Sequence, residues 1–122
     1  MEKLVIEATD NSPKIVLDPV ENKFEISGSS FLTATDDFYS GVIQWMSGYV
    51  TEPKSAMVFN FRMNYINSSS KKTFFKLFKL LEDVKTDLII GWYYEEGDED
   101  LLEEGIIFSK YFKLKFEFIP FN

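Results

Sequence analysis

The sequence contains neither cysteine nor histidine. Without cysteine the chain has no disulfide, no thiolate nucleophile and no thiolate metal ligand. Without histidine it lacks the commonest general base, the Ser-His-Asp type of triad and the usual zinc ligand. The six glycines are scattered, so there is no glycine-rich loop of the kind that binds phosphates. We therefore expect a protein that is not an enzyme, with no catalytic residue, no cofactor and no bound metal.

Positive charge and long apolar runs are also scarce. The 13 Lys and Arg residues against 20 Asp and Glu residues leave a net charge of −7, which disfavours binding to nucleic acid or to an anionic membrane. The apolar run near the start covers only Leu4–Ile6, too short for a signal peptide. No stretch approaches the roughly 18 apolar residues of a membrane span, so the expected location is the cytoplasm.

One domain is predicted over residues 1–122, because 45% of the residues are hydrophobic and no linker or repeat interrupts them. The first strands are joined by turns. Later strands alternate with helices, which implies parallel pairs with right-handed crossovers. We expect a mixed α/β sheet with about three helices packed mainly on one face, the first capped by Thr35. Strands are predicted at residues 4–6, 14–17, 24–27, 57–66, 87–94 and 113–120. The first helix is predicted to start within residues 33–37 and to extend to about residue 49. The second follows the serine cluster and extends to about residue 84, and the third follows the acidic turn at residues 95–100 and extends to about residue 112.

The clearest strand covers Met57–Ile66, where apolar and polar residues alternate. Such a strand has one face in the core and one largely in water. The wet face carries Asn60, Arg62 and Asn64, which are candidates for docking a partner. The predicted core face carries Met57, Phe59, Phe61, Met63 and Tyr65.

A cluster of hydroxyl side chains follows this strand, at Ser68–Ser70. Residues of this kind commonly cap a helix, and Asn67 or Ser68 is the predicted cap. The same position also suits a regulated phosphosite, since a phosphate would lie at the positive end of a helix. Lys71 and Lys72 follow Ser68 by three and four residues, within reach on one helical turn. Capping and phosphorylation are compatible.

An acidic run covers Glu95–Asp100. Its spacing does not match a calcium-binding loop. A metal-dependent enzyme that uses this loop is the less favoured alternative, and a negatively charged docking surface that includes Glu95, Glu96 and Asp98 is favoured. A protein-interaction module without phosphorylation, which binds through the wet face of the central strand, is a further alternative.

Several motifs occur in a characteristic order from about Glu2 to Pro120. They are Ile6–Pro13, Val16–Pro19, Phe24–Ser30, Asp37–Tyr39 leading to Trp45, Tyr65–Lys71, Leu80–Glu82 and Trp92–Asp100. Together they resemble the SiaC family of bacterial regulatory phosphoproteins. The resemblance implies a STAS-like fold, similar to anti-sigma-factor antagonists.

The resemblance also implies partner switching. A Ser/Thr kinase would phosphorylate the protein at the start of the helix after the central strand, and a PP2C-type phosphatase would reverse this. The unphosphorylated form would bind and activate an output partner such as a diguanylate cyclase, and so control c-di-GMP and biofilm formation. Carried onto this sequence, the phosphoacceptor is Ser68, where the family often has threonine, with Ser69 and Ser70 as alternatives. Asn67, Lys71 and Lys72 would surround it.

Overall fold

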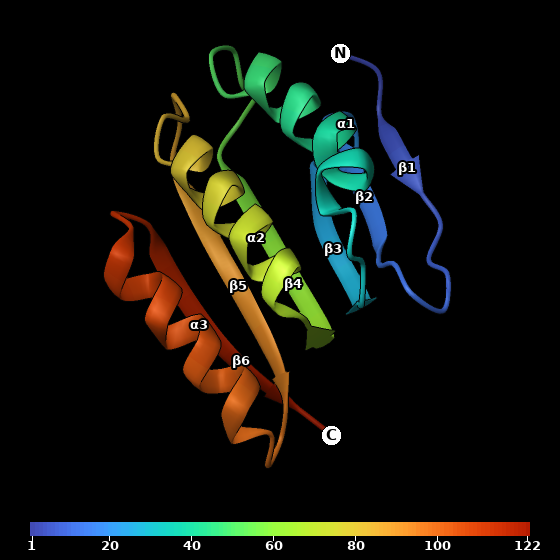
Figure 1. Cartoon of the computed structure of the whole chain (residues 1–122). Helices are drawn as coiled ribbons and strands as arrows, with labels where there is room; N and C mark the ends of the chain where they lie inside the picture. Colours follow the sequence, from blue (N-terminus) through green and yellow to red (C-terminus); the bar gives the residue numbers. More distant parts are fainter.

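The computed structural model describes residues 1–122 and contains one six-stranded sheet and three helices (Figure 1). The expected mixed sheet with three helices is confirmed. The strands are β1 (Leu4–Ile6), β2 (Lys14–Asp18), β3 (Lys23–Ser30), β4 (Met57–Ile66), β5 (Leu88–Glu95) and β6 (Lys115–Phe121), and the helices are α1 (Thr35–Tyr49), α2 (Ser68–Leu81) and α3 (Glu99–Tyr111).

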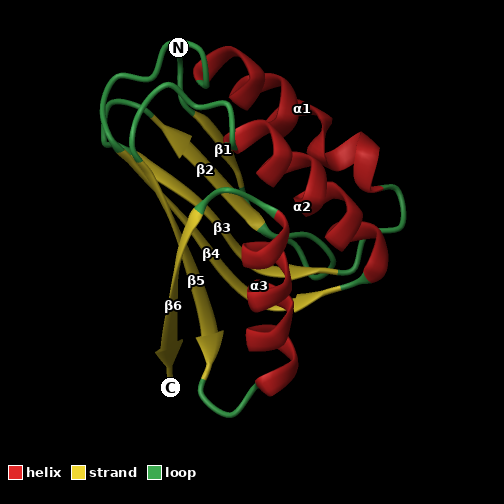
Figure 2. Cartoon of the chain, turned by 90° about the vertical axis from the view of Figure 1, so that its left-hand side faces the viewer, coloured by secondary structure: helices red, strands yellow, loops and turns green.

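The six strands lie in the sheet in the order in which they occur in the chain. β1, β2 and β3 pair antiparallel, and β3, β4, β5 and β6 pair parallel. Each parallel connection contains one helix and advances by one strand in the same direction. Because such crossovers are right-handed, all three helices are placed on the same face. Figure 2 shows this arrangement, with the opposite face of the sheet uncovered.

The core lies between the sheet and the helices and is rich in aromatic rings. The ring of Phe61 on β4 lies 5.4 Å from that of Phe74, 4.9 Å from that of Phe78 and 5.8 Å from that of Trp92, between ring centroids. The Trp92 indole N–H donates to the carbonyl of Leu101 at 3.0 Å. This hydrogen bond joins β5 to the start of α3. It also gives a partner to the indole N–H, which is the only polar group of the fully buried Trp92 side chain.

The start of α1 differs from the prediction. Ala34 occupies the N-cap position and makes no side-chain cap, whereas Thr35 is already the first helical residue. The Thr35 hydroxyl donates to the carbonyl of Ser69 at 3.4 Å, so it joins α1 to the start of α2 instead of capping its own helix. The predicted cap at Thr35 is therefore wrong. None of the three helices has the length and apolar character needed to cross a bilayer.

The end of β4 also departs from the predicted strict alternation of buried and exposed side chains. Gly28 pairs with Met63 but Ser29 pairs with Tyr65, so Asn64 is an extra residue in β4, beside a glycine with φ of 110°. A bulge of this kind reverses which face the following side chains occupy. Tyr65 is consequently exposed, and Ile66 takes the buried position. The placement of Tyr65 on the core face is therefore wrong.

Candidate functional site

The candidate site lies where β4 ends and α2 begins, and Asn67 holds this junction in place. Its side-chain carbonyl accepts the N–H of Ser70 at 2.9 Å, and its amide group donates to the carbonyl of Leu32 at 2.9 Å. Its backbone N–H donates to the carbonyl of Ser30 at 3.1 Å. Of the two predicted caps, the structure assigns the role to Asn67, which ties the helix start to the segment after β3.

The three serines of the cluster have different environments. Ser70 is fully buried, Ser69 is half-buried and Ser68 is exposed. The hydroxyls of Ser70 and Ser30 share a hydrogen bond of 2.6 Å, and those of Ser30 and Tyr39 share one of 2.8 Å. The Ser70 hydroxyl is therefore part of a buried network and is closed to a modifying enzyme, whereas the Ser68 hydroxyl is open to one.

Burial also affects the tyrosine at the end of this network. Removal of the Tyr39 hydroxyl from water raises its pKa to about 12, and the hydrogen bond with Ser30 opposes the shift. Burial disfavours the charged phenolate, because a phenolate loses more solvation than a phenol. The link between Ser30, Tyr39 and Ser70 was not predicted from the sequence, because no local pattern connects residues 30, 39 and 70.

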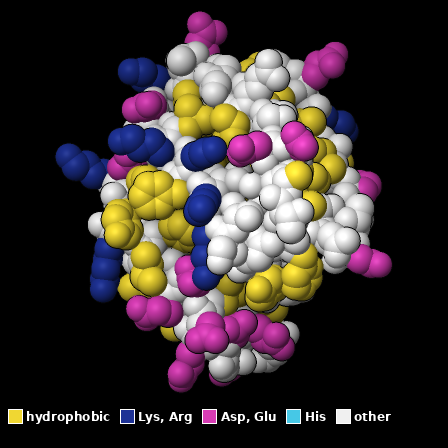
Figure 3. All heavy atoms as spheres, viewed as in Figure 1, with side chains coloured by type: hydrophobic (Ala, Val, Ile, Leu, Met, Phe, Trp, Pro, Cys, Tyr) yellow, Lys and Arg dark blue, Asp and Glu magenta, His cyan; other side chains and the backbone are white.

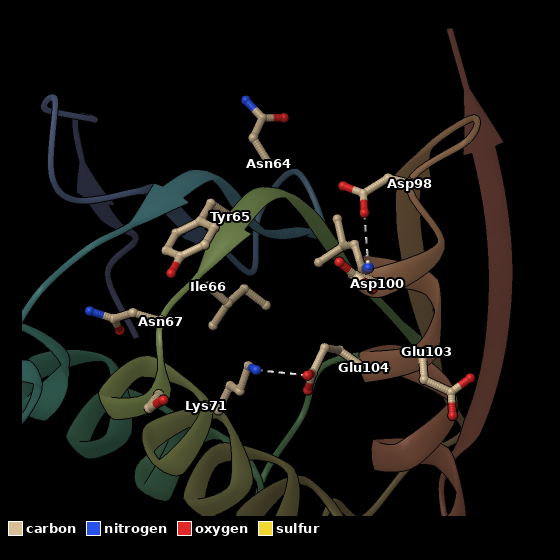
Figure 4. Close-up of a pocket in the computed structure, with 11 residues that line it drawn as sticks. Asn64, Tyr65, Ile66, Asn67, Lys71, Asp98, Asp100, Glu103 and Glu104 are labelled. Atoms are coloured by element: carbon tan, nitrogen blue, oxygen red, sulfur yellow. Dashed lines mark hydrogen bonds and ion pairs between the residues drawn. The ribbon is translucent and has the colours of Figure 1, made fainter.

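The acidic residues that follow β5 gather at one end of the molecule (Figure 3). Four of them, Asp98, Asp100, Glu103 and Glu104, line a groove with Ser68 that has a volume of about 490 Å³. Asp98 caps α3, since its side chain accepts the N–H of Leu101 at 3.1 Å. The sequence treats the serine cluster and the acidic run as separate features, and the structure brings them together. Figure 4 shows the groove, whose charged lining consists of Lys71, Asp98, Asp100, Glu103 and Glu104.

Lys71 is the only positively charged side chain that lines this groove. Its ammonium group lies 2.7 Å from a carboxylate oxygen of Glu104 on α3 (Figure 4). Lys72, also predicted beside the phosphosite, is exposed and lines a different groove between α2 and α3. Glu95 and Glu96 are exposed and do not line the Ser68 groove. Of the residues predicted around the phosphosite, Asn67 and Lys71 line the groove with Ser68, and the docking candidate Asp98 lines it too.

This geometry makes the groove sensitive to added charge. Ser68 is the first residue of α2, so its N–H group and that of Ser69 precede the intrahelical hydrogen bonds and lie at the positive end of the helix dipole. Four carboxylates line the opposite part of the groove. A phosphate on Ser68 would add about −1.5 to −2 charges to the groove. The only cation of the groove, Lys71, is already paired with Glu104.

Comparisons with known proteins agree with this fold. Residues 6–121 match the SiaC family of regulatory phosphoproteins. The chain belongs to the SiaC family. Its structure is similar to that of apo-SiaC from Pseudomonas aeruginosa, with a TM-score of 0.88, 21% sequence identity, and coverage of 98% of this chain and 99% of that one.

A second similar structure is that of the diguanylate cyclase SiaD in complex with its activator SiaC, also from P. aeruginosa. The TM-score is 0.89 at 21% identity, with 97% of this chain and 99% of the other covered. An uncharacterised protein of P. aeruginosa strain UCBPP-PA14 is 24% identical over 106 residues, which is 84% of each chain. Structural likeness at these identities establishes the SiaC-like fold.

Asn60 and Arg62, two further docking candidates of this SiaC-family protein, lie on the uncovered face of the sheet. The Arg62 guanidinium lies 4.2 Å from the ring centroid of Tyr93, and its Nε lies 3.5 Å from a carboxylate oxygen of Glu25. The Asn60 carboxamide fills the space that a side chain at Gly91 would occupy. Asn64, displaced by the bulge, lines the Ser68 groove. The three candidates are thus divided between two surfaces.

The acidic run does not form a metal-ligand cluster in this structure. No three Asp or Glu side chains are arranged so that they could hold one metal ion. Asp98 instead accepts a hydrogen bond at the helix start, and Glu104 forms an ion pair with Lys71. The geometry therefore gives no support to a metal-dependent enzyme centred on Glu95–Asp100.

Proposed function

We propose that this SiaC-family phosphoprotein is a non-enzymatic, cytoplasmic switch that acts by exchanging partners, with Ser68 as its phosphoacceptor. A Ser/Thr protein kinase adds the phosphate, and a PP2C-type phosphatase removes it. The unphosphorylated form binds and activates an output protein such as a diguanylate cyclase, and thereby controls c-di-GMP signalling and biofilm formation.

The observation that carries the proposal is the exposure of Ser68 beside a fully buried Ser70. A kinase must place the acceptor hydroxyl in its own active site, so it needs a side chain that is free of the protein core. Ser68 meets this requirement, and Asn67 rather than Ser68 supplies the helix cap. Modification of Ser68 therefore leaves the hydrogen bonds at the helix start intact.

The charge of the groove supports a switch. The phosphate adds negative charge to a surface that is already acidic and enters a groove whose cation has a partner. A partner that binds near this surface loses affinity through repulsion and through the cost of desolvating the phosphate. A hundredfold change in affinity, about 2.7 kcal/mol, is enough to switch binding.

The choice of a diguanylate cyclase as the example of an output partner is supported by the structural relative. The P. aeruginosa protein SiaC is named as the activator of the diguanylate cyclase SiaD, with which it forms a complex. The identity of 21% supports the class of output and not a particular enzyme.

Mass spectrometry of the protein isolated from its native cell tests the acceptor. Trypsin cuts after Arg62 and Lys71, and the resulting peptide of residues 63–71 contains all three serines. Partial phosphorylation localised to Ser68 is the expected result. Phosphate on Ser69 or Ser70 would move the acceptor and contradict the assignment to Ser68.

Binding to the output partner tests the switch itself. Ser68→Ala is expected to bind constitutively, and enzymatically phosphorylated wild-type protein is expected to bind about a hundredfold more weakly. Enzymatic phosphorylation is preferable to Ser68→Glu, because a carboxylate carries less charge than a phosphate. Equal binding by the phosphorylated and unphosphorylated forms would instead favour the interaction module without phosphorylation.

A further inference from the structure

The sheet face opposite the helices is uncovered (Figure 2), and its two halves differ in kind. β1, β2 and β3 pair antiparallel, and an antiparallel sheet commonly has one face in water. β3 to β6 pair parallel, and parallel strands are normally covered on both faces. On the uncovered side of the parallel half, the strand registers place the apolar residues Val58, Ile89, Tyr93, Ile119 and Phe121. The parallel half therefore lacks the second cover that such strands usually have.

The charges on this face are balanced, unlike those of the whole chain. The same registers place basic and acidic residues of the strands on it in equal number, namely Lys14, Lys23, Arg62 and Lys115 with Asp18, Glu25, Glu95 and Glu117. The chain as a whole carries a net charge of −7, so two copies repel each other when their acidic surfaces meet. The uncovered face is a surface on which a second copy can approach without this repulsion.

Two neighbouring rows of side chains cross the uncovered face, at right angles to the strands. Phe24 pairs with Phe59, which aligns Lys23 with Val58, and the row continues through Ile89 to Lys115. The adjacent row consists of Glu25, Asn60, Gly91 and Glu117. One row therefore has a lysine at each end, and the other row has a glutamate at each end.

This pattern is complementary to a two-fold copy of itself. A two-fold axis that runs between the two rows places each row against the other row of the second copy. Lys23 then faces Glu25 of the second copy, Lys115 faces Glu117 of the second copy, and the symmetry repeats each pair. Packed sheets lie about 10 Å apart with their strands within about 30° of each other, a gap that a lysine and a glutamate side chain span together.

The charges on β6 are free to form such pairs. Lys115 and Glu117 are both exposed, and neither forms an ion pair within its own chain. On β3, by contrast, Glu25 has Lys23 at 3.9 Å and Arg62 at 3.5 Å as partners. We therefore expect β6 to contribute most of the charge complementarity.

We infer that the protein forms a two-fold dimer through its uncovered sheet face, and that the occupant of this face is a second copy of the same chain. Val58, which is 47% exposed, and Ile89 lie at the centre, between the charged ends of the rows. Six strands about 4.8 Å apart and about 20 Å long give a face of about 600 Å². Stable interfaces bury about 800 Å² on each partner, so the dimer is reversible and dissociates on dilution.

The dimer goes beyond the proposed switch and leaves the phosphosite accessible. The axis makes the facing strands antiparallel, so the carboxyl ends of β4 in the two copies point to opposite ends of the dimer. Ser68 follows that end of β4, and the helices lie on the outer faces of the two sheets. Phosphorylation of Ser68 is therefore expected to leave the dimerisation constant unchanged.

Sedimentation velocity over a range of protein concentrations tests the dimer. The wild-type protein is expected to shift from monomer to dimer as its concentration rises. Lys115→Glu and Glu117→Lys are each expected to weaken the dimer by at least about tenfold, because the symmetry places every reversed charge in the interface twice. Lys110→Glu makes the same charge change as Lys115→Glu at an exposed position of α3, on the covered side of the sheet, and is expected to have little effect.

Two rescue experiments identify the occupant as a second copy in this orientation. The double variant Lys115→Glu/Glu117→Lys restores opposite charges across the axis and is expected to regain dimerisation. A mixture of the two single variants brings an acidic pair of one copy against a basic pair of the other. The mixture is therefore expected to form heterodimers at concentrations at which each variant alone is monomeric.

Several results would overturn the inference. A wild-type protein that stays monomeric at all concentrations has no such interface. A dimer that is weakened equally by Lys110→Glu and Lys115→Glu, or that neither reversal on β6 weakens, uses another surface. Failure of the mixed variants to associate would reject the two-fold pairing of Lys115 with Glu117. A dimer that dissociates when Ser68 is enzymatically phosphorylated would contradict an interface distant from Ser68.

Discussion

Adjacent residues on the two sides of α2 have opposite environments. Phe74 is fully buried between the rings of Tyr39 and Phe61, at centroid distances of 5.9 Å and 5.4 Å, whereas Phe75 is 41% exposed. The same contrast separates the buried Ser70 from the exposed Ser68. One side of the helix is part of the core, and the other side faces water.

This contrast is what the proposed switch at Ser68 requires, because charge added on the exposed side of α2 does not enter the core. The buried side supplies the stability, through aromatic packing and a closed hydrogen-bond network. The exposed side supplies the chemistry, through a serine, a set of lysines and an acidic groove. Substitutions on the two sides should therefore have effects of different kinds, on stability and on binding respectively.

The largest expected effect comes from truncating the buried aromatic ring. Phe74→Ala should lower the free energy of unfolding by about 3–5 kcal/mol, because it removes a buried ring and leaves a cavity. Phe75→Ala should lower it by about 1 kcal/mol or less, since the side chain already contacts water. Urea denaturation of both variants measures the difference. Similar losses for the two variants would show that the two sides of α2 are not distinct.

The buried network should make stability fall in alkali. Tyr39 ionises near pH 10 in the unfolded chain and near pH 12 in the folded protein. Between these values the unfolded chain has lost the proton and the folded protein has kept it, so rising pH favours unfolding. The contribution is fully present below pH 10 and is lost as the pH rises to 12, by about 1.4 kcal/mol at pH 11 and about 2.7 kcal/mol in full.

Urea denaturation between pH 8 and pH 11 checks this prediction. Tyr39→Phe should remove this part of the pH dependence, because phenylalanine does not ionise. Tyr111→Phe, at an exposed position, is the control and should keep the wild-type slope. An unchanged slope in Tyr39→Phe would contradict the raised pKa of Tyr39.

A moderate effect is expected at the helix cap. Asn67→Ala removes the acceptor of the Ser70 N–H and the donor to the Leu32 carbonyl, and should cost about 1–2 kcal/mol of stability. Asn64→Ala, at an exposed position three residues earlier, should change stability by less than about 0.5 kcal/mol. Thermal unfolding of the two variants compares them. A neutral Asn67→Ala would argue against the cap.

The smallest effect on stability is expected at Ser68, the proposed phosphoacceptor. Ser68→Ala should change the free energy of unfolding by less than about 0.5 kcal/mol, because Ser68 is exposed and does not cap α2. Ser70→Ala should cost about 1–2 kcal/mol, since it removes the hydroxyl that bonds to Ser30. Denaturation midpoints measure both. A large loss in Ser68→Ala would mean that effects on partner binding cannot be separated from effects on folding.

Much of the fold could be predicted from the sequence. The alternation over Met57–Ile66 and the helical spacing after it locate β4 and α2 because side-chain period is a local property. Strict alternation failed at Tyr65, where the bulge is visible only from the pairing of β4 with β3. The predicted cap failed at Thr35, because its hydroxyl is directed to a carbonyl 34 residues away.

The candidate site was predicted in part. The serine cluster, Asn67 and Lys71 were identified from their position after the strand, because a helix start has unpaired N–H groups. Asp100, Glu103 and Glu104 were missed as neighbours of Ser68, since they lie about 30 residues further along the chain. The assignment of Ser68 as the acceptor stays a prediction until the phosphate is mapped.

The sequence by itself determined the order of strands and helices, the side of the sheet that the helices cover and the absence of cysteine and histidine chemistry. These follow from side-chain period, from the handedness of crossovers and from composition, which need no knowledge of distant contacts. Only the tertiary structure decided which serine is exposed, and that Lys71 pairs with Glu104 across 33 residues of chain. Exposure and ion pairing depend on how two helices pack on the sheet, and no local pattern specifies that packing.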